Sequence, residues 1–150
     1  MPEAHAGRAP QLLLAFDYGK RRIGVATGDT LSRTASPLTA IVVGADGPSW
    51  PEIISLVRKW QPARAIVGLP YNADGSESPM SAGARAFAAE LAHRCSLAVE
   101  LIDERYSSLE AEERLRRARE AGLRKRRVAK TDVDAAAACV ILERWIEEKT

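Results

Sequence analysis

Acidic and amide side chains follow three apolar stretches of this sequence, each at the point where the stretch ends. The stretches are residues 12–16, 65–69 and 97–102, and the polar residues that follow them are Asp17, Asn72, Asp74, Asp103 and Glu104. In open α/β sheets, ligands bind beyond the carboxyl ends of the strands. If these stretches are strands of one sheet, we expect a functional site where the polar side chains meet.

The residue types available there favour metal chemistry over nucleophilic catalysis. The chain has only two histidines, and His5 falls in the polar N-terminal stretch while His93 falls near the end of a predicted helix. Catalysis by a Ser-His or Cys-His pair is therefore not favoured. Carboxylates without nitrogen or sulfur ligands suit Mg²⁺ or Mn²⁺, which bind through a few carboxylates, water and substrate phosphates.

Spacing leaves alternatives open within two acidic pairs. Asp103 and Glu104 are adjacent on a predicted strand, so their side chains point to opposite faces and only one can reach a given site. Asp132 and Asp134 are two apart on a predicted helix, about 200° around its axis. Asp132 is the better helix cap and Asp134 the better candidate to face the sheet. Asp17 can also be read as an ordinary turn residue at a strand end, and Asp74, followed by glycine, as part of a turn.

The charges of the chain are unevenly distributed. The 22 Lys and Arg against 20 Asp and Glu give a net charge of +2. Residues 114–130 have nine basic residues and one acid, a local charge of +8, so the rest of the chain has a charge of −6. The nine are Arg114, Arg116, Arg117, Arg119, Arg124, Lys125, Arg126, Arg127 and Lys130. A concentrated basic patch attracts nucleic acid, although a charge run can also be a solvated surface; a second cluster at residues 20–22 favours nucleic acid.

The elements that must position these residues follow from the apolar patterning. Residues 12–16, 23–28 and 35–43 are predicted strands joined by short connections, which favours an antiparallel meander. Helices are predicted from 49 or 50 to 60, from 79 to at least 91, from 108 to 122 and from about 133 to 147, with strands at 65–69 and 97–102. The order predicts an α/β fold with a five-stranded mixed sheet, three antiparallel strands plus two parallel ones, and helices on both faces.

Length and composition indicate one ordinary domain. A chain of 150 residues buries enough surface to need no metal or disulfide staple, and 46% apolar with 28% charged residues is in the globular range. We expect residues 1–11 to be a flexible tail and 12–150 the folded domain.

No apolar run approaches membrane-spanning length and no signal-peptide pattern is seen, so a cytoplasmic location is expected. The cysteines, Cys95 and Cys139, are interpreted as small buried residues of a reducing compartment.

The same residues carry a resemblance to the YqgF/RuvX family that extends from about residue 12 to 145. The shared motifs are 14–19 (LAFDYG), 22–26 (RIGVA), 35–38 (ASPL), 66–76 (IVGLPYNADGS), 103–108 (DERYSS) and 133–138 (VDAAAA). Sugar kinases and actin-like ATPases share the Asp-x-Gly of the first motif, but the ordered set is specific. The family comprises bacterial proteins described as Holliday junction resolvases and as pre-16S rRNA nucleases, with a ribonuclease H-like fold.

The resemblance implies a site and an activity. Asp17, Glu104 and Asp134 would be the catalytic carboxylates and the ligands of Mg²⁺ or Mn²⁺, which resolves both acidic pairs. The activity implied is metal-assisted phosphodiester hydrolysis in the 5′-end processing of pre-16S rRNA, or on branched DNA, with the ribosome as a further partner. The residues expected to bind the nucleic acid are Lys20, Arg21, Arg22, Asn72, Arg105, Arg124, Lys125, Arg126, Arg127 and Lys130. The chain departs from the family pattern at Ser108, where the family often has Thr, and in the extra acid Asp132.

Two other functions are consistent with parts of the pattern. A ribosome- or RNA-associated binding factor would keep the fold and the basic patch but cleave little. An actin-like or kinase-like phosphotransferase would share the Asp-x-Gly motif. We disfavour the latter because that architecture places two such domains around the nucleotide, and 150 residues supply one.

Overall fold

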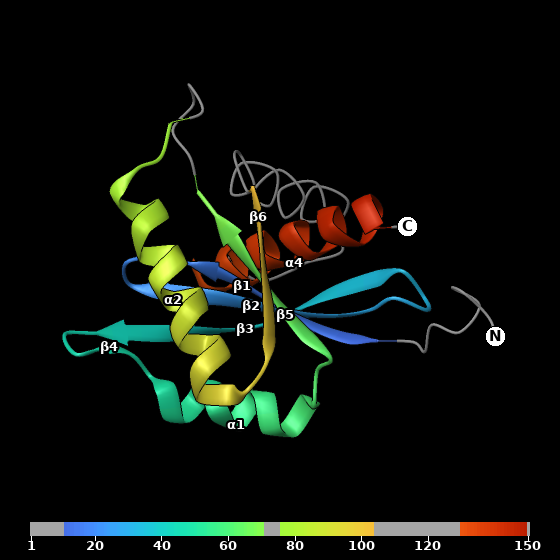
Figure 1. The fold of residues 1–150 in the computed structure, drawn as a ribbon, viewed down its shortest axis with the longest axis horizontal. Coiled ribbons are helices and arrows are strands. Elements are labelled where there is room, and N and C mark those ends of the chain that lie inside the picture. The colour runs from blue at the N-terminus through green and yellow to red at the C-terminus, as the bar shows by residue number, and fades with distance from the viewer. Residues whose placement is uncertain (1–10, 71–75, 104–129, 150) are drawn as a thin grey trace.

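The computed structural model describes residues 11–70, 76–103 and 130–149. The chain forms β1 (Leu12–Tyr18), β2 (Arg22–Asp29), β3 (Thr34–Gly44), β4 (Gly47–Pro48), α1 (Trp50–Trp60), β5 (Arg64–Leu69), α2 (Pro79–Cys95), β6 (Ala98–Asp103) and α4 (Lys130–Lys149) (Figure 1). None of the helices among these residues has the length and apolar character needed to span a membrane.

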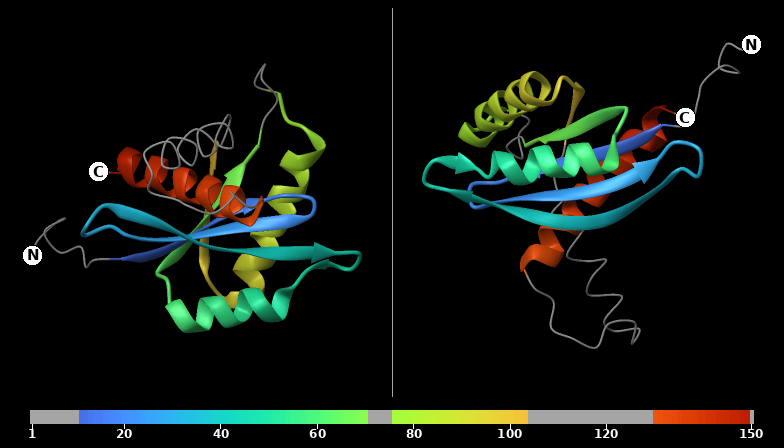
Figure 2. Two further views of the ribbon diagram at one scale, coloured as in Figure 1. Left: turned by 180° about the vertical axis from the view of Figure 1, so that it is seen from behind. Right: turned by 90° about the horizontal axis from the view of Figure 1, so that it is seen from below.

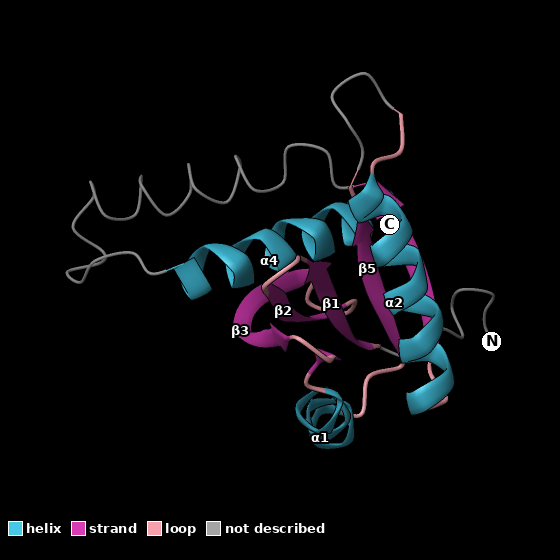
Figure 3. Ribbon diagram, turned by 90° about the vertical axis from the view of Figure 1, so that its left-hand side faces the viewer, coloured by secondary structure: helices cyan, strands magenta, loops and turns pink. Residues whose placement is uncertain are grey.

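The strands form one sheet in the order β4-β3-β2-β1-β5-β6. The first four strands are joined antiparallel, whereas β1 pairs with β5 and β5 with β6 in parallel. Helices α1 and α2 cover one face and α4 crosses the other, as Figures 2 and 3 show. The predicted mixed sheet with helices on both faces is therefore confirmed.

Two details of the prediction were wrong. The sheet has six strands and not five, because Gly47 and Pro48, which lie in none of the predicted strands, pair with Val43 and Gly44. The last helix begins at Lys130 and not near 133, so Asp132 lies in its first turn and is not a cap. An acidic side chain is favourable there too, since it faces the positive end of the helix dipole. The helix predicted at 108–122 lies outside the described residues.

The two faces of the sheet are packed differently. Towards α1 and α2, the core is aromatic: the ring of Phe87 lies 5.8 Å from Phe16, 5.3 Å from Tyr18 and 5.5 Å from Trp50, between centroids. Towards α4, the helix presents the small buried side chains of Ala138 and Cys139, which lie in one cluster with Leu13, Ala15 and Ala26 of the sheet. Cys139 is buried as expected, whereas Cys95 at the end of α2 is only half-buried. Small side chains allow α4 to lie close to the sheet.

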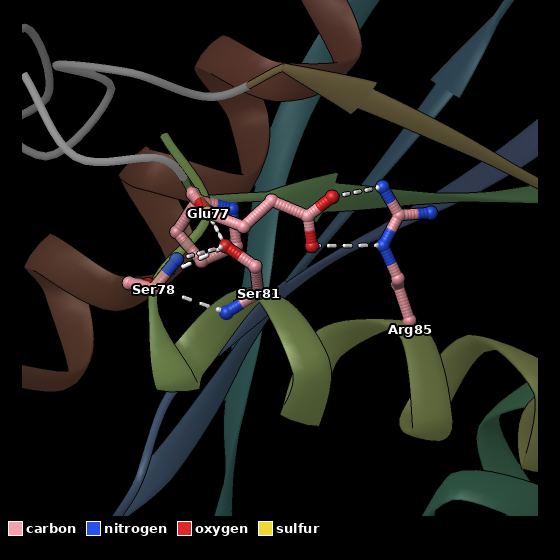
Figure 4. Close-up of polar contacts among 5 residues, drawn as sticks. Glu77, Ser78, Ser81 and Arg85 are labelled. Carbon is pink, nitrogen blue, oxygen red and sulfur yellow. Dashed lines mark hydrogen bonds and ion pairs between the residues drawn. The ribbon is translucent and has the colours of Figure 1, made fainter. Parts of the chain in front are cut away.

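The start of α2 is fixed by a capping box that the sequence analysis missed. The Ser78 backbone N–H donates to Ser81 Oγ at 2.9 Å, and the Ser81 N–H donates to Ser78 Oγ at 3.4 Å (Figure 4). Ser81 stands at the third helical position, where a capping box usually has Glu or Gln, so the sequence does not show the usual capping-box pattern. Ser81 is fully buried and its hydroxyl also donates to the Pro70 carbonyl. The cap therefore ties α2 to the residue that directly follows β5.

Candidate active site

Strand alternation places Asp17 on the α4 face of the sheet. In β1, Leu14 and Phe16 belong to the core against α1 and α2, whereas Leu13 and Ala15 belong to the core against α4. Side chains two apart share a face, so Asp17 faces α4. The Asp17 side chain lies near the carboxyl end of the strand and is partly exposed. This is the position expected of a site residue.

Gly24 brings α4 into contact with the strand beside Asp17. Gly24 is the register partner of Asp17 in the antiparallel pair of β1 and β2. A Cβ atom built on Gly24 would lie only 1.9 Å from the backbone oxygen of Asp134 and 2.4 Å from its carbonyl carbon. Only glycine permits this approach. Asp17 and Asp134, which are 117 positions apart, are thus each adjacent to the same glycine.

The Asp134 side chain faces the sheet, as expected. Its Oδ2 accepts a hydrogen bond from Arg22 Nε at 2.5 Å. Arg22 is the first residue of β2 and shares the α4 face with Gly24 and Ala26, because all three are of the same parity. The two side chains are 29% and 24% exposed, so the ion pair lies at the rim of the α4 face and not in the core.

The third strand end is fixed through α4. In β6, Ile102 packs in the core against α4, so Asp103 is of the opposite parity and faces away from it. Arg144 Nη1 donates to the Asp103 backbone carbonyl at 2.7 Å, which holds the end of β6 against the helix. Arg144 was not singled out from the sequence, where nothing distinguishes it from other helix-surface arginines. Glu104 lies outside the described residues.

The remaining predicted binding residues divide into two groups. Lys20 and Arg21 are exposed on the turn between β1 and β2, where Gly19 makes a close approach to the Arg22 carbonyl oxygen. Lys130 is the first residue of α4. The residues that lie outside the described part of the chain are Asn72, Arg105, Arg124, Lys125, Arg126 and Arg127. Within the described residues, no group of three potential metal ligands is found.

At the other end of α4, a second polar cluster joins the helix to the sheet. Glu100 on β6 accepts hydrogen bonds from Trp145 Nε1 at 3.2 Å and from Arg64 Nη1, and Lys149 Nζ lies 3.7 Å from it. Burial raises the pKa of Glu100, but these hydrogen bonds and the charges of Arg64 and Lys149 outweigh it and hold the pKa below the usual 4.5. Glu100 is thus a fully partnered carboxylate.

The donor set beside Gly24 fits a hard divalent cation. Asp17 and Asp134 contribute carboxylate oxygens on the same face, and both are partly exposed, so a cation and a phosphate can reach them. The described part of this site contributes no cysteine or histidine. Oxygen donors of this kind are those that Mg²⁺ and Mn²⁺ take in proteins.

Comparison with known proteins assigns the family. The family model described as RuvX, Holliday junction resolvase, matches residues 11–148. A protein of Xanthomonas campestris pv. campestris (strain 8004), named "Putative pre-16S rRNA nuclease", is 47% identical over 146 residues, which is 97% of this chain and 94% of that protein. A protein of Bordetella pertussis with the same name is 44% identical over 137 residues, 91% of this chain and 94% of its own length.

A comparison with solved structures agrees with the fold. RuvC of T. thermophilus in complex with a Holliday junction substrate matches with a TM-score of 0.58 and 15% identity, over 92% of this chain and 94% of that one. The fold is therefore ribonuclease H-like. Holliday junction resolvases are nucleases, so the expectation that the protein is a phosphodiester hydrolase is confirmed. Because the family model spans all but the ends of the sequence, the chain belongs to the RuvX family of Holliday junction resolvases.

Proposed function

We propose that the protein is a metal-dependent endonuclease that acts in the cytoplasm on the 5′ end of pre-16S rRNA. The observation that carries this proposal is the contact between Gly24 and the Asp134 backbone. It brings the helix residue Asp134 onto the strand residue that is the register partner of Asp17, near the end of β1. Two carboxylates at one sheet edge, far apart in sequence, form the kind of acidic site that a nuclease needs to bind a cation.

Asp17, Asp134 and Glu104 would hold the cation, Mg²⁺ or Mn²⁺. Glu104 rests on the family resemblance, and Asp103 is the weaker candidate because its neighbour Ile102 packs against α4, so the Asp103 side chain faces away from that helix. When bound, the ion activates water and stabilises charge on the scissile phosphate. The carboxylates orient the reacting groups, and without a cation they would repel one another.

Positive side chains beside these carboxylates would hold the nucleic acid backbone. Lys20 and Arg21 are exposed on the turn that directly follows β1, a few residues from Asp17. The basic segment 114–130 and Arg105 and Asn72 remain predicted contributors. Contacts of this kind bind phosphates without reading sequence, and their strength falls as salt rises.

The names of the relatives support the choice of substrate. Proteins 44–47% identical to this chain carry the name of a pre-16S rRNA nuclease, which favours a ribosomal RNA precursor, with the assembling ribosome as a partner. The description of the family model favours a second substrate, the four-way DNA junction. Both are polyanions that the same carboxylate site could cleave.

The experiment compares three proteins on both substrates. Wild type, Asp17→Asn and Asp46→Asn are incubated with a 16S precursor and, separately, with a four-way DNA junction, in Mg²⁺ or Mn²⁺. Asp46 is matched as a control, because it is an exposed acid in the turn between β3 and β4. We expect wild type and Asp46→Asn to cleave the 16S precursor, and Asp17→Asn to be slower by at least about 100-fold.

Four results would contradict all or part of the proposal. Metal-independent cleavage, or equal cleavage by wild type and Asp17→Asn, would exclude Asp17 as a catalytic ligand. Absence of cleavage by all three proteins, together with salt-dependent RNA binding that Asp17→Asn leaves intact, would favour the binding factor. Cleavage of the junction alone would move the substrate from RNA to DNA.

A further inference from the structure

The ion pair between Arg22 and Asp134 occupies one oxygen of a carboxylate that the proposed function assigns to the metal. We propose that Arg22 is a positioning residue that competes with the cation for Asp134 Oδ2 and thereby sets the metal concentration at which the site fills. This inference rests on the proposed function. It differs from the role expected from the sequence, in which Arg22 only binds phosphate.

The backbone around the pair is fixed, so the exchange has to occur in the side chains. The Asp134 carbonyl lies against Gly24 with no room for even a methyl group. Ala138 and Cys139, in the next turn of α4, belong to the core between the helix and the sheet. Because α4 has no room to shift towards β2, a cation at Asp134 Oδ2 would lie beside the guanidinium of Arg22 unless that side chain moves away.

The exposure of the pair makes this movement feasible. The Arg22 side chain is 29% exposed and the Asp134 side chain 24%, and Arg22 is the first residue of its strand. An arginine at a strand end can swing into solvent without disturbing the sheet. The ion pairs of buried carboxylates are hard to break, whereas a partly exposed pair contributes little net stability.

The charges give the direction of the effect. Arg22 satisfies Asp134 with one positive charge, and a divalent ion placed at the same oxygen would repel that charge at close range. Removing the guanidinium should leave the carboxylate available and strengthen metal binding. A residue that only held Asp134 in place would have the opposite effect, because its loss would let the ligand move and weaken metal binding.

The test measures Mn²⁺ binding by isothermal titration calorimetry, without nucleic acid. We expect Arg22→Gln to bind Mn²⁺ more tightly than wild type, on the order of tenfold. Arg22→Lys keeps the charge but loses the directed Nε–H bond, so its affinity should fall between the two. Arg21→Gln removes the same charge from the neighbouring exposed position and should change the affinity by no more than about twofold.

The outcomes separate this inference from the proposed function. If wild type binds Mn²⁺ and Arg22→Gln binds it equally or more weakly, the competition is excluded while the metal site stands. If Arg21→Gln tightens binding as much as Arg22→Gln, the effect is general electrostatics and the inference also fails. If wild type binds no Mn²⁺, both the metal-dependent function and the competition are excluded. Should Arg22→Gln not fold, which far-UV circular dichroism would show, Arg22→Lys is compared with Arg21→Lys. Loss of the directed Nε–H bond should then tighten Mn²⁺ binding in Arg22→Lys alone, and equal affinities would exclude the competition.

Discussion

Each end of α4 lies at a pair formed by an arginine and a carboxylate, but the two pairs are built differently. Near the N-terminal end, the helix supplies the carboxylate, Asp134, and β2 supplies Arg22. Near the C-terminal end, the sheet supplies both Glu100 and Arg64, and the helix adds Trp145.

The difference lies in how many groups hold each carboxylate. Glu100 has donors on both oxygens, with Lys149 nearby, and Arg64 lies 5.8 Å over the ring of Trp145. Within the described part of the chain, the carboxylate of Asp134 accepts a hydrogen bond from Arg22 Nε, and the close packing of this residue is made by its backbone on Gly24. A carboxylate with many partners holds elements together, whereas one fixed by its backbone can exchange its partner. The C-terminal end of α4 therefore stabilises the fold, whereas the N-terminal end carries a carboxylate of the proposed metal site.

The largest effect should come from filling the space at the site end. Gly24→Ala places a methyl group 1.9 Å from the Asp134 carbonyl oxygen, a contact between backbone atoms that no rotamer change relieves. We expect a loss of roughly 3 kcal/mol, at the upper end of what overpacking usually costs, because the backbone on the other side of the contact cannot rotate away. For a chain of this size the melting temperature should fall by about 6–12 °C, and cleavage should fall with it because Asp134 is pushed away from Asp17.

Gly44→Ala is the matched control for that substitution. Gly44 ends β3, and a Cβ atom built there meets nothing within 4 Å. The melting temperature of Gly44→Ala should stay within about 2 °C of wild type. If calorimetry shows that Gly24→Ala is as stable as Gly44→Ala, the close contact of α4 with β2 is not present in solution.

A smaller effect, on stability alone, should follow from weakening the other end. Trp145→Phe removes the donor to Glu100 and part of a ring that is only 6% exposed. The combined loss of a hydrogen bond and of packing should cost about 1–2 kcal/mol, seen as a fall of roughly 3–8 °C in melting temperature. Mn²⁺ affinity and the cleavage rate at 25 °C should change by less than about twofold. A large loss of metal binding in this variant would show that the two ends are not independent.

The contrast between the ends also marks what the sequence could predict. Alternation and strand ends identified Asp17, and helical spacing favoured Asp134 over Asp132 as the residue facing the sheet. Both inferences depend on local periodicity, which is fixed by backbone geometry. Glu104 was selected by the family resemblance, and its place remains a prediction.

Contacts between distant elements were not predictable in the same way. Nothing in the isoleucine-glycine-valine stretch around Gly24 shows that a helix 110 residues later would lie on it. The sequence likewise suggested phosphate binding for Arg22, because a cluster of basic residues does not reveal that one member faces a carboxylate. The two-residue β4 was missed because glycine and proline are typical of turns, and pairing over two residues leaves no periodic pattern.

The smallest effect should be a change in how stability depends on pH at the C-terminal end of α4. The pKa of Glu100 is lowered in the folded protein, so its ionised form stabilises the fold above about pH 4.5, and this contribution is lost as the pH falls through the lowered pKa. Glu100→Gln removes it. Because the side chain is 31% exposed, solvent screens the interaction and the difference should be about 1 kcal/mol or less at pH 7.

Urea unfolding of wild type and Glu100→Gln between pH 7 and pH 3 measures this difference. The free energies of unfolding should converge as the pH falls below 4.5, since the protonated glutamate has no charge left to pair with Arg64 or Lys149. In 1 M NaCl the gap at pH 7 should narrow without closing, because salt screens the charges but not the hydrogen bond from Trp145. If the difference in the free energy of unfolding between the two proteins stays constant from pH 7 to pH 3, Glu100 is held by packing and hydrogen bonding and not by its charge. The two ends of α4 would then differ in geometry alone and not in electrostatics.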